Sequence, residues 1–234
     1  MIGKKVQDTR VRTGIPGMDD LLEGGFIRNS TVLLRGKAGS GKTIFGLQYL
    51  LYGALHDEPG ILLSIEETKK DLYRESLRFG WNLEFLERQG KLAILEKHTQ
   101  YSITIHEIEK AALRIGAKRV VVDSIPALFS SYPNELQPSE HRSAFHLLCQ
   151  VLTDSCDCTV ILISETDWSE RLFYEEYVPK GVIELSTKMM EGIARKFLLI
   201  KKMREVRHSK REHLYEITDN GFTLFIPRTK YGRE

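Results

Sequence analysis

Hydrophobic residues gather in short runs along the first two thirds of this chain, and longer segments with helical spacing separate the runs. Short runs rich in Val, Leu and Ile are typical of buried parallel strands. The runs lie at residues 31–35, 61–65, 92–95, 119–123 and 159–164, and the helical segments at 43–55, 69–79, 103–115 and 145–152. This alternation predicts an α/β fold with a largely parallel sheet and helices on both faces.

The last part of the chain has a different pattern, in which apolar stretches follow one another closely. They lie at residues 181–185, 195–204, 214–217 and 222–225. Asp219-Asn220-Gly221 is a turn sequence between the last two, so we expect antiparallel strands that extend the sheet.

Turn formers and breaks in the pattern suggest the limits of the domain. We expect one domain at 31–227, preceded by a lead-in segment at 1–30 and followed by a tail at 228–234. Prolines and serines interrupt the pattern at 124–139, which predicts a loop there.

Composition narrows the class of protein. Lys and Arg number 34 against 32 Asp and Glu, a net charge of +2, whereas a generally basic nucleic-acid binder would show more asymmetry. No apolar run is long enough to span a bilayer and the first residues lack a signal peptide's apolar stretch, so we expect a cytoplasmic protein without membrane association. The three cysteines have no fourth ligand at zinc spacing, which favours buried thiols.

Directly after the first run comes Gly36-Lys37-Ala38-Gly39-Ser40-Gly41-Lys42-Thr43. This octapeptide fits G-x-x-x-x-G-K-[ST], the phosphate-binding loop of nucleoside-triphosphate hydrolases. Glycines bring backbone N–H groups close to phosphate oxygens, Lys42 would contact the β- and γ-phosphates, and the Thr43 hydroxyl would bind Mg²⁺. Because a strand precedes the loop and a helix follows it, we expect ATP or ADP and Mg²⁺ to bind here.

Acidic residues stand at the ends of two later runs. Glu66 and Glu67 follow the second run, and Asp123 ends the fourth. Open α/β sheets place their chemistry at such strand ends, so one glutamate could accept the proton of the attacking water; alternatively, both are favourable acidic residues at a helix N-terminus. A buried strand that ends in Asp must give that charge a partner, and Mg²⁺ held by Thr43 and Asp123 is the expected one.

A resemblance favours the first of these alternatives. Thr13-Gly-Ile-Pro-Gly-Met-Asp-Asp-Leu-Leu-Glu-Gly-Gly-Phe, followed shortly by the phosphate loop, resembles the opening of the RecA superfamily and most closely its circadian-clock KaiC-like branch, over residues 10 to 227. The resemblance implies an ATPase with a catalytic Glu-Glu pair, here Glu66 as the base and Glu67 as the alternate. It also implies a polar γ-phosphate sensor at the end of the fifth run, Glu165, although a plain strand terminus explains Glu165 equally well.

The same resemblance implies residues that act on the neighbouring subunit. Its Lys-x-Arg pattern, with a nearby His, Lys and turn Asp, matches Lys202, Arg204, His208, Lys210 and Asp219. An arginine supplied in trans stabilises charge on the transferring phosphoryl group. The implied assembly is a head-to-tail homo-oligomer, usually a hexameric ring, whose monomer would be a poor ATPase.

This chain departs from the clock members of that branch. It has one copy of the module, and Glu176-Tyr177 stands where clock autokinases carry a Ser-Thr pair, so we do not expect clock-type autophosphorylation. We expect slow ATP hydrolysis that signals through nucleotide-dependent conformation to a protein partner that the sequence does not identify.

The alternative function is a RecA- or RadA-like DNA-processing ATPase. Residues 195–213 carry eight basic and two acidic side chains, which suits a nucleic-acid patch as well as a solvated basic face. The segment from Glu165 to Tyr177 has the aromatic residues of a single-strand DNA loop but a charge of −4, the wrong sign for DNA. Binding of nucleic acid is therefore possible but not favoured.

Overall fold

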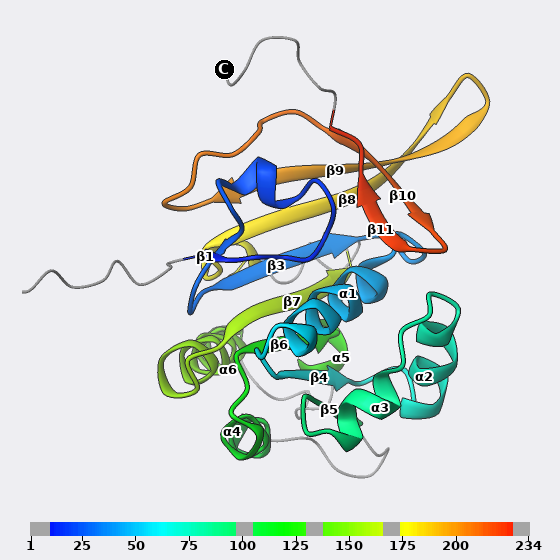
Figure 1. Ribbon diagram of the computed structural model, residues 1–234. Coiled ribbons are helices and arrows are strands. Elements are labelled where there is room, and N and C mark those ends of the chain that lie inside the picture. Colours follow the sequence, from blue (N-terminus) through cyan, green and yellow to red (C-terminus); the bar gives the residue numbers. More distant parts are fainter. Residues whose placement is uncertain (1–9, 97–104, 130–137, 166–173, 227–234) are drawn as a thin grey trace, which may run out of the picture.

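A nine-stranded sheet runs through the molecule in the order β11-β10-β9-β8-β3-β7-β6-β4-β5 (Figure 1). The computed structural model describes residues 10–96, 105–129, 138–165 and 174–226. The strands are β3 (Thr31–Gly36), β4 (Gly60–Ser64), β5 (Leu92–Glu96), β6 (Arg119–Asp123), β7 (Thr159–Glu165), β8 (Gly181–Met190), β9 (Ile193–Met203), β10 (His213–Thr218) and β11 (Gly221–Leu224). From β8 to β5 all neighbours are parallel, whereas β8 to β11 pair antiparallel. The predicted fold class is confirmed.

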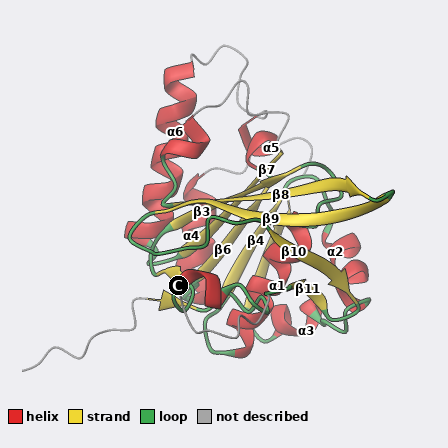
Figure 2. Ribbon diagram, turned by 90° about the horizontal axis from the view of Figure 1, so that it is seen from above, coloured by secondary structure: helices red, strands yellow, loops and turns green. Residues whose placement is uncertain are grey.

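Helices cover both faces of the sheet. They are α1 (Lys42–Leu55), α2 (Lys69–Leu77), α3 (Leu83–Arg88), α4 (Ile105–Ile115), α5 (Ile125–Phe129), α6 (Pro138–Gln150) with the π-helical turn η2 (Val151–Ser155), and α7 (Tyr174–Tyr177). Figure 2 shows α4, α5 and α6 on one side and α1 and α3 on the other. Side chains alternate accordingly along β6, where Val121 joins one hydrophobic core while Val120 and Val122 join the second.

The lead-in segment packs on the same core as α1. It holds the 3₁₀ turn η1 (Asp19–Leu22) and a small antiparallel pair, β1 (Arg10–Val11) with β2 (Phe26–Ile27). The Asp19 carboxylate accepts hydrogen bonds from the backbone N–H and the hydroxyl of Thr13, at 2.8 and 2.7 Å. These bonds close the segment into a loop, and its apolar side chains are buried. The domain boundary at residue 30 stays a prediction.

The loop predicted at 124–139 is wrong in part. It contains α5, and α6 begins at its end. A proline at the start of a helix has no N–H to lose, so Pro126 is compatible with α5, and burial of Leu128 and Phe129 in the second core holds this short helix. Residues 130–137 lie outside the described part of the chain.

The hairpin of β8 and β9 is longer than the apolar pattern indicated. β3 ends at Gly36, which pairs with Leu185, yet the hairpin continues to a turn at Glu191-Gly192, where both residues have positive φ. Because its outer half is exposed on both faces, hydrophobicity did not reveal it. Within the described residues, no helix combines the length and apolarity needed to cross a bilayer.

Candidate nucleotide-binding site

The phosphate loop connects β3 to α1, as the motif requires. Gly39 and Gly41 have φ of +73° and +92°, a region that favours glycine. A Cβ on Gly41 would also lie 2.3 Å from Cδ1 of Ile217, so no other residue fits there without a shift. The loop therefore ends at the N-terminus of α1, where unpaired backbone N–H groups attract anions.

Two polar side chains of the loop point inward. The Lys42 ammonium is buried and donates to the carbonyl oxygens of Gly36 and Lys37, at 2.8 and 3.1 Å. The Ser40 hydroxyl is also buried, and it has no hydrogen-bond partner among the described residues. A buried hydroxyl without a partner is costly, so the loop holds a polar group that a bound anion could satisfy.

The C-terminal strands support the loop in a way that sequence reasoning missed. The Tyr215 hydroxyl, on β10, donates to the carbonyl of Ser40 at 2.7 Å, and the Lys196 ammonium, on β9, donates to the carbonyl of Gly39 at 2.9 Å. Lys196 belongs to the basic run at 195–213, which was a signal, but nothing local to Tyr215 indicates its partner 175 positions away. Both contacts depend on sheet order.

The predicted metal ligands lie together. The Thr43 hydroxyl donates to Oδ2 of Asp123 at 2.7 Å, because β6 ends beside the start of α1. Burial raises the pKa of Asp123, the Thr43 hydrogen bond lowers it, and the charge of Glu66 raises it again; the net direction is upward. Such a carboxylate is stabilised in its charged form by a cation.

The two glutamates follow β4 at the same edge of the sheet. Ser64 pairs with Asp123 across the sheet, so Glu66 lies beside Ser124, whose hydroxyl donates to its Oε1 at 3.3 Å. Burial, followed by the charges of nearby carboxylates, raises the pKa of Glu67 to about 7. The structure thus brings Glu66, Glu67 and the metal ligands to one end of the sheet.

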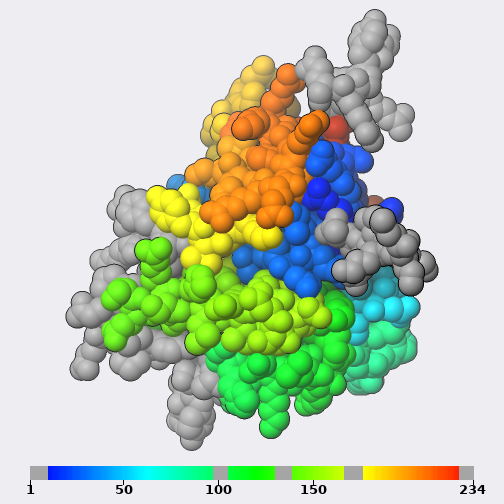
Figure 3. Space-filling view, turned by 90° about the vertical axis from the view of Figure 1, so that its left-hand side faces the viewer, coloured from blue at the N-terminus to red at the C-terminus, as the bar shows by residue number. Residues whose placement is uncertain are grey.

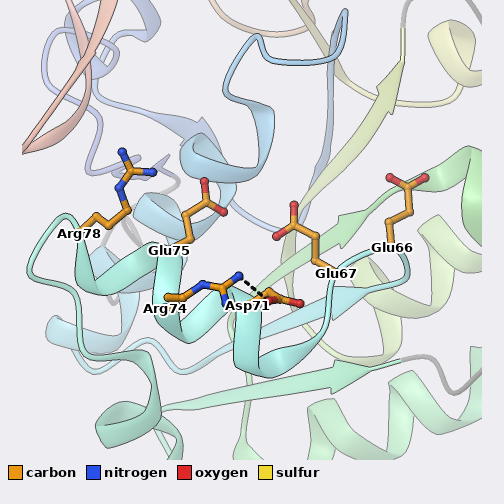
Figure 4. A pocket seen from close by; sticks show the side chains of 6 residues that line it. All are labelled: Glu66, Glu67, Asp71, Arg74, Glu75 and Arg78. Atoms are coloured by element: carbon orange, nitrogen blue, oxygen red, sulfur yellow. Dashed lines mark hydrogen bonds and ion pairs between the residues drawn. The ribbon is translucent and has the colours of Figure 1, made fainter.

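An acidic pocket of about 420 Å³ flanks this edge (Figure 4). Four carboxylates and two guanidinium groups line it, those of Glu66, Glu67, Asp71, Glu75, Arg74 and Arg78. Asp71 and Arg74 pair at 2.7 Å within α2, whereas Glu67 lies between Glu66 and Glu75 in Figure 4. The phosphate loop does not line this pocket, which is therefore the acidic flank of the site and not the phosphate position itself.

Glu165, the predicted sensor, ends β7 directly opposite Gly36 and is exposed. Its position at the mouth of the phosphate loop agrees with either alternative from the sequence. Residues 166–173, most of the acidic and aromatic segment weighed against DNA binding, lie outside the described residues.

Strand β9 ends at the opposite end of the sheet from the phosphate loop (Figure 1), and Lys202 and Arg204 stand at that end of the strand. Strand β9 runs antiparallel to β8, so Lys202 pairs with Val182, near the start of the parallel strands. Lys196, which does contact the loop, is six residues away, or about 20 Å along the strand. Neither Lys202 nor Arg204 can span that distance with its side chain.

The remaining predicted trans residues divide between the two ends. His208 and Lys210 lie in the loop after β9, beyond Arg204. Asp219 instead lies in the exposed turn after β10, two residues past Ile217, which packs on Gly41. The structure therefore does not bring Asp219 together with the other four and places it on the side of its own phosphate loop.

The residues present fit Mg²⁺ with a nucleoside triphosphate. Among the described residues no group of three or more His, Cys, Asp or Glu could hold a metal ion. Mg²⁺ does not need such a cage, because it is commonly bound by one or two carboxylates together with substrate phosphates and water. One hydroxyl and one carboxylate 2.7 Å apart, beside a glycine cradle with a buried lysine, match that requirement.

A phosphate loop after the first core strand, an aspartate at the end of β6 and a mostly parallel sheet with antiparallel C-terminal strands define a P-loop ATPase of the RecA superfamily. The model of the KaiC ATPase family matches residues 11–228, so the chain belongs to that family. The predicted resemblance is confirmed.

Relatives of two sizes are similar to this chain. A UPF0273 protein of Aeropyrum pernix is 37% identical, with 92% of this chain and 93% of that protein covered. The circadian clock oscillator protein KaiC of Acaryochloris marina is 32% identical over 94% of this chain but only 45% of its own length. The crystal structure of a KaiC-like protein from Pyrococcus horikoshii superposes with a TM-score of 0.83 at 36% identity, covering 93% of this chain and 99% of that one.

Proposed function

We propose that this protein hydrolyses ATP with Mg²⁺ at a site that is complete only when a second copy lends Lys202 and Arg204. The main support for this proposal is the distance between two lysines on β9. Lys196 contacts the phosphate loop, whereas Lys202 lies six residues further along the strand. Two cations that fit the phosphoryl-transfer role but are out of reach of their own loop support a contact between copies.

The residues of one copy would hold the nucleotide and the ion. Backbone N–H groups of residues 36–43 and the Lys42 ammonium would bind the phosphates, and Thr43 and Asp123 would hold Mg²⁺, which neutralises phosphate charge when bound. The carboxylate of Glu66 would accept the proton of the attacking water. Geometry favours Glu66 as the base, since it lies beside Ser124 and the metal ligands. Glu67 is the alternate, because its pKa is raised to about 7.

A contact between one end of the sheet and the other end of the next copy is head-to-tail. Such contacts close into rings, and we propose a hexamer. His208 and Lys210, near Arg204, would face the neighbour's nucleotide, whereas Asp219 would face the nucleotide of its own subunit. Slow turnover would make the nucleotide state of the ring a signal to a protein partner.

The test measures ATP turnover as a function of protein concentration. For the wild type we expect turnover per subunit to rise with concentration as the assembly forms. Glu66→Gln with Glu67→Gln should abolish turnover but keep ATP binding, and Arg204→Ala should reduce it by roughly 10³. Turnover independent of both concentration and Arg204 would remove the shared site from the account.

A mixing experiment tests whether the two halves of the site come from different subunits. Lys42→Ala subunits lack a working loop but keep Arg204, and Arg204→Ala subunits have the opposite defect. Random assembly at equal amounts places a competent pair at roughly a quarter of the contacts, so we expect roughly that fraction of wild-type turnover from two nearly inactive proteins. Absence of rescue at every ratio would contradict the ring.

A further inference from the structure

Lys202 and Arg204, the two cations proposed to act on a second copy (the lent cations), are both held in this structure by one turn, α7. The Lys202 ammonium donates to the carbonyl oxygens of Glu176 and Tyr177, at 2.7 and 3.4 Å, and Nη2 of Arg204 donates to the same Tyr177 carbonyl at 3.3 Å. In Figure 3 the segment from α7 into β8, in yellow, lies against the end of β9 and the following loop, in orange. The position of α7 therefore determines the position and orientation of these two side chains.

A buried arginine in turn holds α7. Arg35 on β3 is 9% exposed, and its Nη1 pairs with the carboxylate of Glu176. Its Nε and Nη2 both donate to one carboxylate oxygen of Glu184 on β8, at 3.0 and 2.7 Å. Lys201 completes the cluster at 3.9 Å from Glu176 and 3.4 Å from Glu184.

Phosphate binding does not account for this charge. Arg35 follows three apolar residues in a strand that is buried along its whole length, and a buried guanidinium is costly unless it is paired. Glu184 alone would occupy two of its donors, yet the third reaches α7. Arg35 also immediately precedes Gly36, the first residue of the phosphate loop, so one side chain joins the strand that carries the loop to the turn that holds the lent cations.

We propose that Arg35 and Glu176 are positioning residues, which fix α7 so that Lys202 and Arg204 are presented to the nucleotide of the next copy. This inference rests on the proposed function. Without the pair, α7 would lose its tie to β3, and the side chains of Lys202 and Arg204 would be held less firmly in place. Small errors in the placement of these cations should lower the rate of phosphoryl transfer strongly, since its catalysis depends mostly on positioning and charge stabilisation.

The test compares two isosteric substitutions that each remove one carboxylate from Arg35. Glu176→Gln removes the ion pair between Arg35 and α7, whereas Glu184→Gln leaves that pair intact and is the matched control. We expect Glu176→Gln to lower kcat by on the order of tenfold to a hundredfold, with a much smaller change in KM for ATP because the phosphate loop is intact. Glu184→Gln should lower kcat far less, and Glu176→Asp, which keeps the charge, should recover part of the loss.

Complementation separates positioning from a general structural defect. In a Glu176→Gln subunit, Lys202 and Arg204 should be misplaced for the site of the next copy, whereas its own phosphate loop and glutamates should remain intact. Mixed with Glu66→Gln/Glu67→Gln subunits, which lend sound cations, it should regain turnover; mixed with Arg204→Ala subunits, it should not, since both are defective in the same half.

The outcomes distinguish this inference from the function on which it rests. If Arg204→Ala leaves turnover unchanged, the shared site itself is wrong. If Arg204→Ala is slow but Glu176→Gln matches Glu184→Gln, or is not rescued by the glutamate double variant, the positioning role is overturned and the proposed function stands.

Discussion

Removing one hydroxyl from the C-terminal strands should weaken ATP binding at the phosphate loop that this hydroxyl contacts. Tyr215 is fully buried, and its hydroxyl donates to the carbonyl of Ser40 in the phosphate loop at 2.7 Å. Tyr215→Phe keeps the ring and its stacking on Phe222, at a centroid distance of 4.2 Å. The substitution therefore deletes a hydrogen bond without opening a cavity.

The size of the effect follows from the acceptor left behind. A buried carbonyl that loses its donor costs about 1–3 kcal/mol. If about 1 kcal/mol of this cost appears in the free energy of ATP binding, because the loop is less well ordered, the affinity falls about fivefold, since 1.4 kcal/mol corresponds to tenfold. The remainder should appear as lower stability of the nucleotide-free protein.

Tyr49→Phe is the matched control for this prediction. Tyr49 is equally buried, and its hydroxyl also donates to a backbone carbonyl, that of Thr159 at 3.1 Å, but it lies outside the phosphate loop. Thermal unfolding should show a loss of stability in both variants, and calorimetric titration with ATP should show weaker binding only for Tyr215→Phe. Equal ATP affinity in the two variants would refute a role for the β10 contact in shaping the loop.

Three further predictions test the local physics. Because its folded pKa is raised to about 7, Glu67 destabilises the metal-free protein increasingly as pH rises from 4.5 to 7. Glu67→Gln should therefore raise the free energy of unfolding at pH 8 by about 1 kcal/mol, since solvent screening reduces the roughly 3 kcal/mol of the full shift. Denaturant unfolding should show this gain at pH 8 and no difference at pH 4. Gly41→Ala should abolish ATP binding, since its Cβ would meet Ile217, whereas Gly80→Ala, with a similar positive φ but open surroundings, should cost only about 1–2 kcal/mol of backbone strain. Burial raises the pKa of Glu87, but hydrogen bonds from a backbone N–H, a lysine and a tyrosine hydroxyl outweigh it, so the net direction is downward. The charged Glu87 therefore stabilises the fold at neutral pH, and this stabilisation is lost as pH falls through the folded pKa. In unfolding curves, the difference in stability between wild type and Glu87→Gln should vanish at acid pH.

Local chemistry explains what could be predicted from the sequence. The phosphate loop depends on positive φ at Gly39 and Gly41 and on a strand and helix on either side, all of which are properties of neighbouring residues. Parallel strands also make strand ends meet at one edge, so the convergence of Asp123 with Thr43 followed from the fold class once the runs were recognised.

Contacts set by sheet order were beyond the reach of pattern reasoning. Lys196 and Tyr215 contact the loop only because β9 and β10 are added antiparallel next to β8, which places residues from the end of the chain beside its start. The same register moves Asp219 to the end of the sheet opposite Arg204, although the two stand close in the sequence. Arg35 did carry a signal, since a charged residue in a buried run needs a partner, but the identity of that partner depended on α7.

Strand β9 links these observations, because it carries both Lys196, which contacts the phosphate loop, and Lys202, which we propose acts on the nucleotide of a second copy. Lys196 reaches the loop of its own subunit, and Lys202 lies on the same strand about 20 Å away. The strand is bonded to β8 on one side and over part of its length to β10 on the other, so side-chain motion cannot shorten this separation. Under the proposed function, a monomer would therefore not complete its own site at any nucleotide concentration, and turnover would require a second copy.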